Sequence, residues 1–139
     1  MTSVTELHGP PHVERYIETD GEEGYRWRND TKILLLFTKG RKSGEERINA
    51  LIFESDGDDY LIVASKGGAA APPGWLLNLE ADAEVEVQIK GDRFKAHARI
   101  ATAEEKPRMW EKMTAVWPNY VAYQESTDRE IPVVVLERA

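Results

Sequence analysis

Two short segments of the chain combine glycine with basic residues, a composition suited to binding anions. The first covers residues 38–47 (TKGRKSGEER) and carries four basic side chains against two acidic ones. Its two glycines allow a tight turn that presents backbone N–H groups. The guanidinium groups of Arg41 and Arg47 and the ammonium group of Lys42 suit a phosphate or carboxylate. The segment lacks the spacing of a Walker loop, and it is either an anion-binding loop or a solvated hairpin turn.

The second segment, residues 64–68 (ASKGG), follows an apolar run and holds Ser65 and Lys66 beside two glycines. Small residues and glycines next to a lysine can form a concave nest of N–H groups that binds an anion. A flexible turn with a solvated lysine is the alternative. Because the whole chain has a net charge of -7, two basic glycine-containing segments would together attract a polyanionic cofactor to one place.

Aromatic and amide side chains recur at helical spacing in two further places. Trp75 and Asn78 share one face of a predicted helix, where the indole could flank a cofactor ring and the amide could hydrogen-bond it. Tyr120 and Tyr123 have the same spacing, and a phenol beside an apolar pocket can donate a proton to an oxygen that is being reduced. Packing is the alternative in each case, with Asn78 bonding a loop backbone. In so short a helix, Tyr123 is the tyrosine more expected to be buried.

The other residue types argue against several kinds of site. The chain has no cysteine, which excludes disulfides and thiolate chemistry. His8 and His12 fall in a predicted tail and His97 on a strand, so nothing suggests a metal site. The acidic net charge disfavours nucleic acid as a partner. The longest apolar run, around residues 33–37, is far shorter than the ~18–20 residues of a membrane span, and no secretory signal is visible. We therefore expect a cytoplasmic protein without stable membrane insertion.

The hydrophobic pattern predicts the elements that must position these residues. Continuous or alternating apolar runs predict six strands, at about residues 32–38, 48–54, 60–64, 85–89, 94–100 and 131–136. Helical spacing and prolines in first turns predict helices at about residues 12–19, 75–81, 102–116 and from 118 onward. The third helix opens with a capping-box pattern from Thr102 to Glu105.

Six strands joined mainly by hairpins, with helices inserted between them, predict a mainly β, α+β domain in the form of a small antiparallel barrel. The 139 residues of the chain suffice for one such domain. Residues 1–30 are predicted to be an N-terminal tail with a short helix, and residues 31–139 the barrel.

Four stretches of the chain, in this order and spacing, resemble the deazaflavin-dependent nitroreductase family, the actinobacterial split β-barrel oxidoreductases that use coenzyme F-420. They are GRKSGEER, DGDDYLIVASKGG, PPGWLLNLEAD and WPNYVAYQESTDREIPVVVL, and the resemblance runs from about Lys32 to Leu136. It implies a split β-barrel related to the flavin-reductase and pyridoxine-oxidase-like FMN-binding barrels, so that residues 31–139 form a coenzyme-binding domain.

The same resemblance implies roles for individual residues. The basic loop would hold the phosphate and polyglutamate tail of the coenzyme, and the second loop and the following helix would lie along it. Tyr120 and Tyr123 correspond to tyrosines on the substrate side of the deazaflavin, which makes them the implied catalytic residues. Trp117 and Ile52 stand where some relatives have further tyrosines. The residues implied to bind the coenzyme are Arg41, Lys42, Arg47, Ser65, Lys66, Trp75 and Asn78.

The function that this resemblance implies is hydride transfer from reduced coenzyme F-420 to an organic acceptor such as an enone, quinone or nitro compound. Two alternatives stay open: an FMN-binding split-barrel reductase, and a non-catalytic carrier of coenzyme F-420. The expected partner is a small-molecule acceptor. The sequence names neither the physiological acceptor nor the proton donor, and it leaves open whether the protein is a monomer or a dimer.

Overall fold

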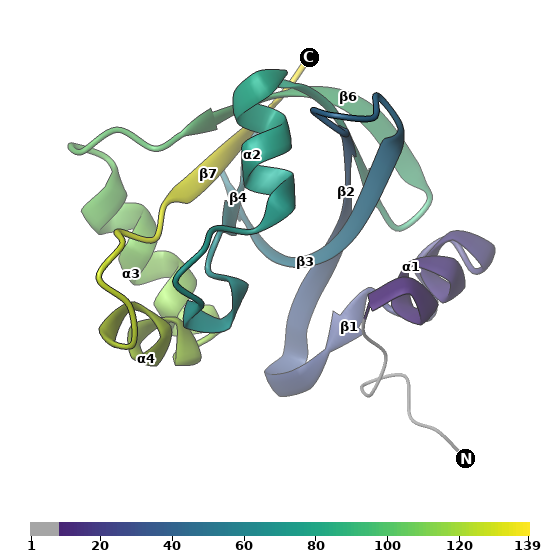
Figure 1. The fold of residues 1–139 in the computed structure, drawn as a ribbon. Helices are drawn as coiled ribbons and strands as arrows, with labels where there is room; N and C mark the ends of the chain where they lie inside the picture. The colour runs from purple at the N-terminus through teal and green to yellow at the C-terminus, as the bar shows by residue number, and fades with distance from the viewer. Residues whose placement is uncertain (1–8) are drawn as a thin grey trace.

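The computed structural model describes residues 9–139, so the first eight residues of the predicted N-terminal tail, including His8, lie outside the described residues. The core of the fold is a closed antiparallel barrel in the order β2-β3-β4-β7-β6-β5, which a β2–β5 pairing completes (Figure 1). The short strand β1, which the hydrophobic pattern did not predict, pairs with the outer end of β2. The strands are β1 (Arg26–Trp27), β2 (Thr31–Lys39), β3 (Glu46–Asp56), β4 (Asp59–Val63), β5 (Glu84–Ile89), β6 (Asp92–Ile100) and β7 (Val133–Arg138).

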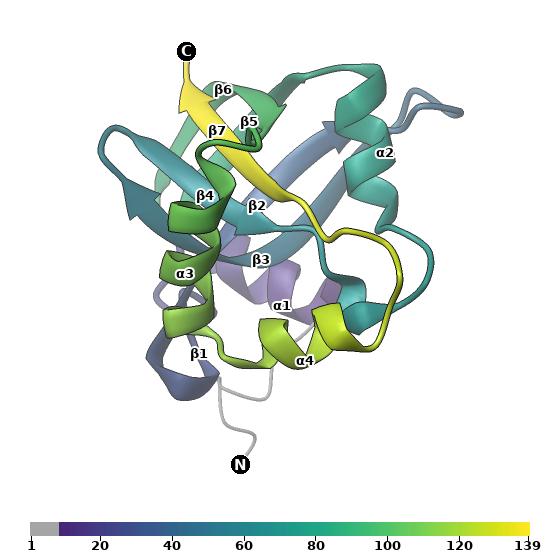
Figure 2. The same cartoon turned by 90° about the vertical axis from the view of Figure 1, so that its left-hand side faces the viewer.

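The helices lie around this barrel and fall close to the predicted ranges (Figures 1 and 2). Helix α1 begins earlier than predicted, because Pro10 and Pro11 occupy its first turn, where a missing N–H is tolerated. No helix within residues 9–139 combines the length and the apolar composition needed to cross a bilayer. The helices are α1 (Gly9–Glu18), α2 (Gly74–Ala81), α3 (Lys106–Val116) and α4 (Asn119–Glu125), with short 3-10 turns η2 (Arg28–Asp30) and η3 (Lys66–Gly68).

The apolar runs are continuous in strands that are covered on both sides. Successive side chains of a strand point to opposite faces. In β2, Leu34 and Leu36 point into the barrel, whereas Ile33, Leu35 and Phe37 pack outside it in the same cluster as α1. Strands β5 and β6 have no such outer layer over most of their length, so they show the alternating pattern with exposed polar residues on the outside.

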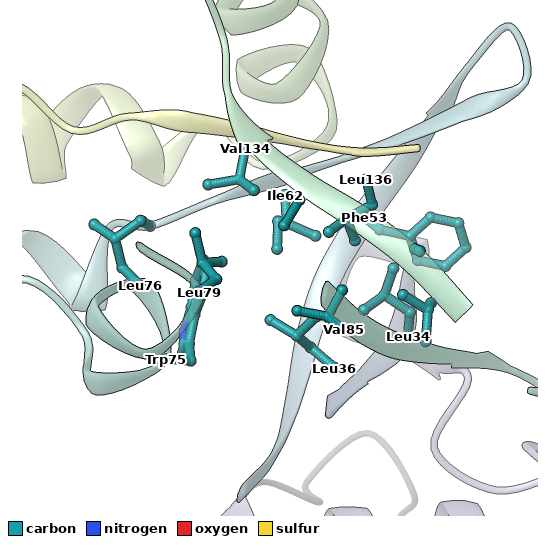
Figure 3. Close-up of a cluster of buried hydrophobic side chains, with 14 of the residues drawn as sticks. Leu34, Leu36, Phe53, Ile62, Trp75, Leu76, Leu79, Val85, Val134 and Leu136 are labelled. Carbon is teal, nitrogen blue, oxygen red and sulfur yellow. The ribbon is translucent and has the colours of Figure 1, made fainter. Parts of the chain in front are cut away.

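Helix α2 covers one opening of the barrel. Its Trp75, Leu76 and Leu79 are buried in the same cluster as the inward-facing strand residues. Figure 3 shows Leu76 and Leu79 on the side of the helix that faces Ile62 and Val134. Burial of each such leucine stabilises the fold by roughly 1.5–3 kcal/mol. The helix is therefore firmly attached, and its N-terminal end becomes a fixed part of the adjoining surface.

Helices α3 and α4 cover the outer face of β4 and β7. The predicted capping box forms: the Thr102 N–H donates to Glu105 Oε1 at 2.9 Å, and the Glu105 N–H donates to Thr102 Oγ1 at 3.3 Å. Met109 and Met113 of α3 and Tyr120 of α4 are buried against the outward-facing strand residues. This packing places α4 beside the loop that follows β4 (Figure 2).

Helix α1 is attached to the barrel through a buried tyrosine. The Tyr16 hydroxyl donates to Ile33 O at 2.9 Å and accepts from the Lys90 N–H at 2.7 Å. Burial raises the pKa of the Tyr16 phenol to about 12. The prediction that His12 lies in a tail was wrong: His12 is only 2% exposed, and its Nε2 lies 2.7 Å from Gly24 O. His12 is buried because the apolar face of α1 packs against the outside of β2.

Candidate functional site

A hollow of about 450 Å³ lies between β3, the loop after β4, the start of α2, and α4. We call it the aromatic chamber because indole and phenol rings form much of its wall. Its volume is within the range of small-molecule sites. It is lined by His12, Trp27, Ile33, Asn49, Ala50, Leu51, Ile52, Val63, Ser65, Lys66, Gly67, Pro73, Gly74, Trp75, Trp117, Tyr120 and Tyr123.

A second hollow of about 310 Å³, which we call the basic chamber, lies between the β2–β3 loop and α2. It is lined by Gly40, Arg41, Lys42, Ser43, Arg47, Asn49, Gly74, Trp75 and Asn78. Asn49, Gly74 and Trp75 line both chambers, so the two hollows adjoin across these residues. The two predicted anion-binding loops thus belong to one composite site, with one loop in each chamber.

The basic chamber has a surplus of positive charge. Arg47 lies 3.9 Å from Glu45, a long and exposed ion pair. Within residues 9–139, Lys42 of this chamber and Lys66 of the aromatic chamber have no acidic partner. The N-terminus of α2, at Gly74, adds the positive end of a helix dipole where the chambers meet. Such unpaired cations suit an anionic ligand.

Asn78 makes the loop-backbone contact that was the alternative to direct cofactor binding. Its Oδ1 accepts from the Arg41 backbone N–H at 3.2 Å and from Arg41 Nη1 at 3.0 Å. Its Nδ2 donates to Thr38 Oγ1 at 3.1 Å. Asn78 therefore holds the basic loop and the Arg41 side chain against α2. Trp75 combines its two interpretations, since it is 6% exposed within the core and still lines both chambers.

The two tyrosines of α4 both line the aromatic chamber, but their burial is the reverse of the prediction. Tyr120 is 5% exposed, whereas Tyr123 is half-buried. Burial holds the pKa of the Tyr120 phenol well above its ordinary value, and the neighbouring Tyr123 adds to this effect. No hydrogen bond within residues 9–139 uses the Tyr120 hydroxyl, whereas Tyr123 Oη accepts from Trp117 Nε1 at 3.5 Å. Tyr120 is thus a neutral donor that is available to a ligand.

The structure adds residues that sequence reasoning missed. Asn49 lies at the junction of the chambers, and Trp27 stacks on Trp117 with ring centroids 5.5 Å apart. Arg129 donates to three backbone carbonyls of the loop after β4. Arg129 belongs to one of the motifs quoted above, but its spacing gave no sign of this contact. Among residues 9–139, no group of three histidine, aspartate or glutamate side chains is arranged to hold a metal ion.

Comparison with known proteins identifies the family of this chain. Residues 10–138 match the family model described as F420H2-dependent quinone reductase, in which F420H2 is reduced coenzyme F-420. An F420H2-dependent quinone reductase of Mycobacterium tuberculosis is 40% identical over 130 residues, which cover 91% of this chain and 87% of that protein. The solved structure of an F420H2-dependent reductase is 37% identical, with a TM-score of 0.70, and covers 76% of this chain and 93% of that one.

A more distant structure shares only the fold. A chain described as a pyridoxamine 5′-phosphate oxidase from Listeria innocua is 14% identical, with a TM-score of 0.54, and covers 91% of this chain and 93% of that one. The predicted split β-barrel and the resemblance to oxidoreductases that use coenzyme F-420 are therefore confirmed. The matched model names quinone rather than nitro reduction. The chain belongs to the F420H2-dependent quinone reductase family.

Proposed function

We propose that this protein transfers hydride from reduced coenzyme F-420 to a quinone, with the deazaflavin ring in the aromatic chamber and the phosphate and glutamyl tail in the basic chamber. The observation that carries the proposal is that the two chambers adjoin at Asn49, Gly74 and Trp75. A coenzyme with an apolar ring at one end and several negative charges at the other needs its surroundings in this order. Enones and nitro compounds are acceptors of the same chemical kind.

The residues of both chambers fit such a coenzyme. Lys42 and Lys66 have no acidic partner within residues 9–139, and Arg41 is held in place by Asn78. Ser65 lines the aromatic chamber, and its hydroxyl, which makes no hydrogen bond within the described residues, is reached by solvent. These solvent-accessible cations and this hydroxyl are available to hydrogen-bond an anionic ligand. We assign them to the coenzyme, as the family resemblance implied.

The coenzyme supplies the hydride when it is bound, and the chain supplies position and a hydrogen-bond donor. As hydride reaches the acceptor, negative charge builds on its oxygen. A neutral phenol stabilises that charge more than it stabilises the uncharged acceptor, and Tyr120, whose pKa is raised by burial, is a neutral phenol at pH 7. Tyr123 and Trp117, which share a hydrogen bond, form the adjacent wall. We assign the donor role to Tyr120, with Tyr123 beside it.

Fluorescence-quenching titration with coenzyme F-420 and with FMN, at one salt concentration, tests the coenzyme assignment. We expect clearly tighter binding of F-420, because the basic loop is more cationic than a single phosphate requires. Equal affinity for the two would favour the FMN reductase alternative. Turnover of a short-chain quinone, an enone and a nitro compound with reduced F-420 is then measured. Tight binding of F-420 without turnover of any acceptor would make the protein a carrier.

A further inference from the structure

Arg129 lies in the connection between α4 and β7, and its guanidinium group holds a loop that is distant in sequence. Its Nη2 donates to Ser65 O at 2.7 Å, its Nε to Ala69 O at 2.9 Å and its Nη1 to Ala64 O at 3.2 Å. No carboxylate within residues 9–139 forms an ion pair with Arg129. All three donor nitrogens of this side chain therefore serve the loop after β4.

These hydrogen bonds determine where the loop N–H groups point. Every peptide bond in residues 9–139 is trans, so each N–H is opposite the C=O of the same peptide unit. Because the carbonyls of Ala64 and Ser65 face Arg129, the N–H groups of Ser65 and Lys66 face the other way. Neither N–H is used in a hydrogen bond within the described residues. Ser65 and Lys66 line the aromatic chamber, whereas Arg129, on whose side the two carbonyls lie, does not.

The backbone conformation of the loop has the form of an anion-binding nest. Ser65 is right-handed helical, with φ of -82°, and Lys66 is left-handed, with φ of +47°. A right-handed residue followed by a left-handed one makes successive N–H groups converge on one point. A left-handed lysine is unfavourable by itself, so the loop needs outside support, which the three hydrogen bonds from Arg129 provide.

The loop after β4 and helix α4 contact each other, and they lie side by side in Figures 1 and 2. The Ser126 hydroxyl donates to Gly68 O at 3.2 Å. A Cβ atom at Gly68, which has a φ of +83°, would lie 2.8 Å from Tyr123 O, so only glycine allows this close approach. Gln124 fixes the backbone of Arg129, because its Nε2 donates to Arg129 O at 2.8 Å.

We propose that Arg129 is a positioning residue that turns the N–H groups of Ser65 and Lys66 into the aromatic chamber, where they bind a carbonyl oxygen of the deazaflavin ring. The inference rests on the proposed function. The ring, and not the phosphate, is the partner because both residues of the nest line the aromatic chamber, whereas the basic loop lines the other chamber. The guanidinium charge also polarises the two peptide groups, which strengthens their N–H donors.

The test compares two ligands. Fluorescence quenching measures the affinity of coenzyme F-420 and of 8-hydroxy-5-deazariboflavin, the ring-and-ribityl fragment that lacks the phosphate and tail. Arg129→Gln should weaken both by the same factor, on the order of tenfold to a hundredfold, because up to two ring contacts are misplaced. Arg129→Lys keeps the charge but cannot bridge three carbonyls, so we expect it to recover only part of the affinity. Lys42→Ala should weaken only the binding of F-420.

Two further measurements separate positioning from general effects. Arg108→Gln removes the same charge from an exposed site on α3, where Arg108 pairs with Asp56, and should leave both affinities unchanged. In wild-type protein, the amide proton resonances of Ser65 and Lys66 should move downfield when the fragment binds. Circular dichroism shows whether each variant is folded, and Arg129→Lys is the variant that retains the loop charge if Arg129→Gln does not fold.

The inference would be overturned if Arg129→Gln bound both ligands as tightly as the wild-type protein, or if Arg129→Lys restored the full wild-type affinity. A loss confined to F-420 would reassign the nest to the phosphate and would also overturn it. If wild-type protein binds neither F-420 nor the fragment, the proposed function itself is wrong and this inference falls with it. Binding of both ligands by wild-type protein, with no effect at Arg129, would leave the proposed function standing and remove only the positioning role.

Discussion

The two chambers of the site are built in different ways. The rings of Trp75, Trp117 and Tyr120 in the aromatic chamber are each less than 10% exposed and belong to the packed clusters of the domain. The cationic side chains of Arg41 and Lys42 in the basic chamber are exposed on a loop. Close packing fixes the shape of the first, whereas salt can screen the charges of the second. Mutations in the aromatic chamber should therefore mainly change turnover, whereas mutations in the basic chamber should mainly change coenzyme affinity.

The largest effect is expected from the tyrosines of the aromatic chamber. Tyr120→Phe removes the buried neutral donor and should lower turnover of a quinone by about tenfold to a thousandfold. Tyr123→Phe should have a smaller effect within that range, because its hydroxyl is bonded to Trp117. Steady-state rates are compared with coenzyme affinity, which should change little. If both variants reduce the quinone at the wild-type rate, the tyrosines are only pocket wall and the proton comes from solvent.

The next effect concerns the basic chamber. Lys42→Ala should weaken binding of F-420 by about 1.5–3 kcal/mol, the value of a hydrogen bond to a charged group, which is roughly tenfold to more than a hundredfold. It should change the free energy of unfolding by less than ~1 kcal/mol, because the side chain is exposed. Lys95→Ala, an exposed lysine on β6 outside both chambers, is the matched control. A Lys42→Ala protein that binds F-420 normally would show that this loop is only a solvated turn.

The packing that shapes the aromatic chamber can be tested through α1, because this helix carries His12, which lines the chamber. Burial raises the pKa of Tyr16 from 10.0 to about 12, so the folded state holds this proton more tightly than the unfolded state does. The protonated Tyr16 therefore contributes about 2–3 kcal/mol to the free energy of unfolding below pH ~10, and this contribution is lost as pH rises toward 12. In Tyr16→Phe, urea unfolding curves measured between those pH values should show a weaker pH dependence, because the contribution of Tyr16 is removed and that of Tyr120 stays. An unchanged pH dependence would mean that Tyr16 does not cause it.

The smallest effect is that of salt, which should act on one chamber only. Raising ionic strength from about 0.05 M to about 0.5 M should weaken F-420 binding several-fold, because the cations of the basic loop are exposed. The ring-and-ribityl fragment, which reaches only the aromatic chamber, should bind almost equally well at both concentrations. Equal salt dependence of the two ligands would contradict the assignment of the charged part of the coenzyme to the basic chamber.

Local patterns in the sequence were sufficient for the six barrel strands, the four helices and the fold class, but not for the short strand β1. Each predicted strand was visible because the alternation or continuity of apolar residues reports which of its faces are covered. The capping box at Thr102 and Glu105 formed as predicted, since its hydrogen bonds join residues three apart. The basic loop and the ASKGG loop were likewise visible as local compositions. The family resemblance, carried by four motifs in order, pointed to coenzyme F-420 and the split β-barrel.

What the sequence by itself determined was thus the barrel strands, the helices and the chemical types available at the site. Only the tertiary structure decided how they meet. Three contacts join segments that lie 12 to 65 positions apart in the sequence: His12 with Gly24, Asn78 with Arg41, and Arg129 with residues 64–69. Such contacts depend on how the closed barrel and its helices pack. No local periodicity records them, because a side chain's spacing along its own element does not specify which distant backbone atoms will lie against it.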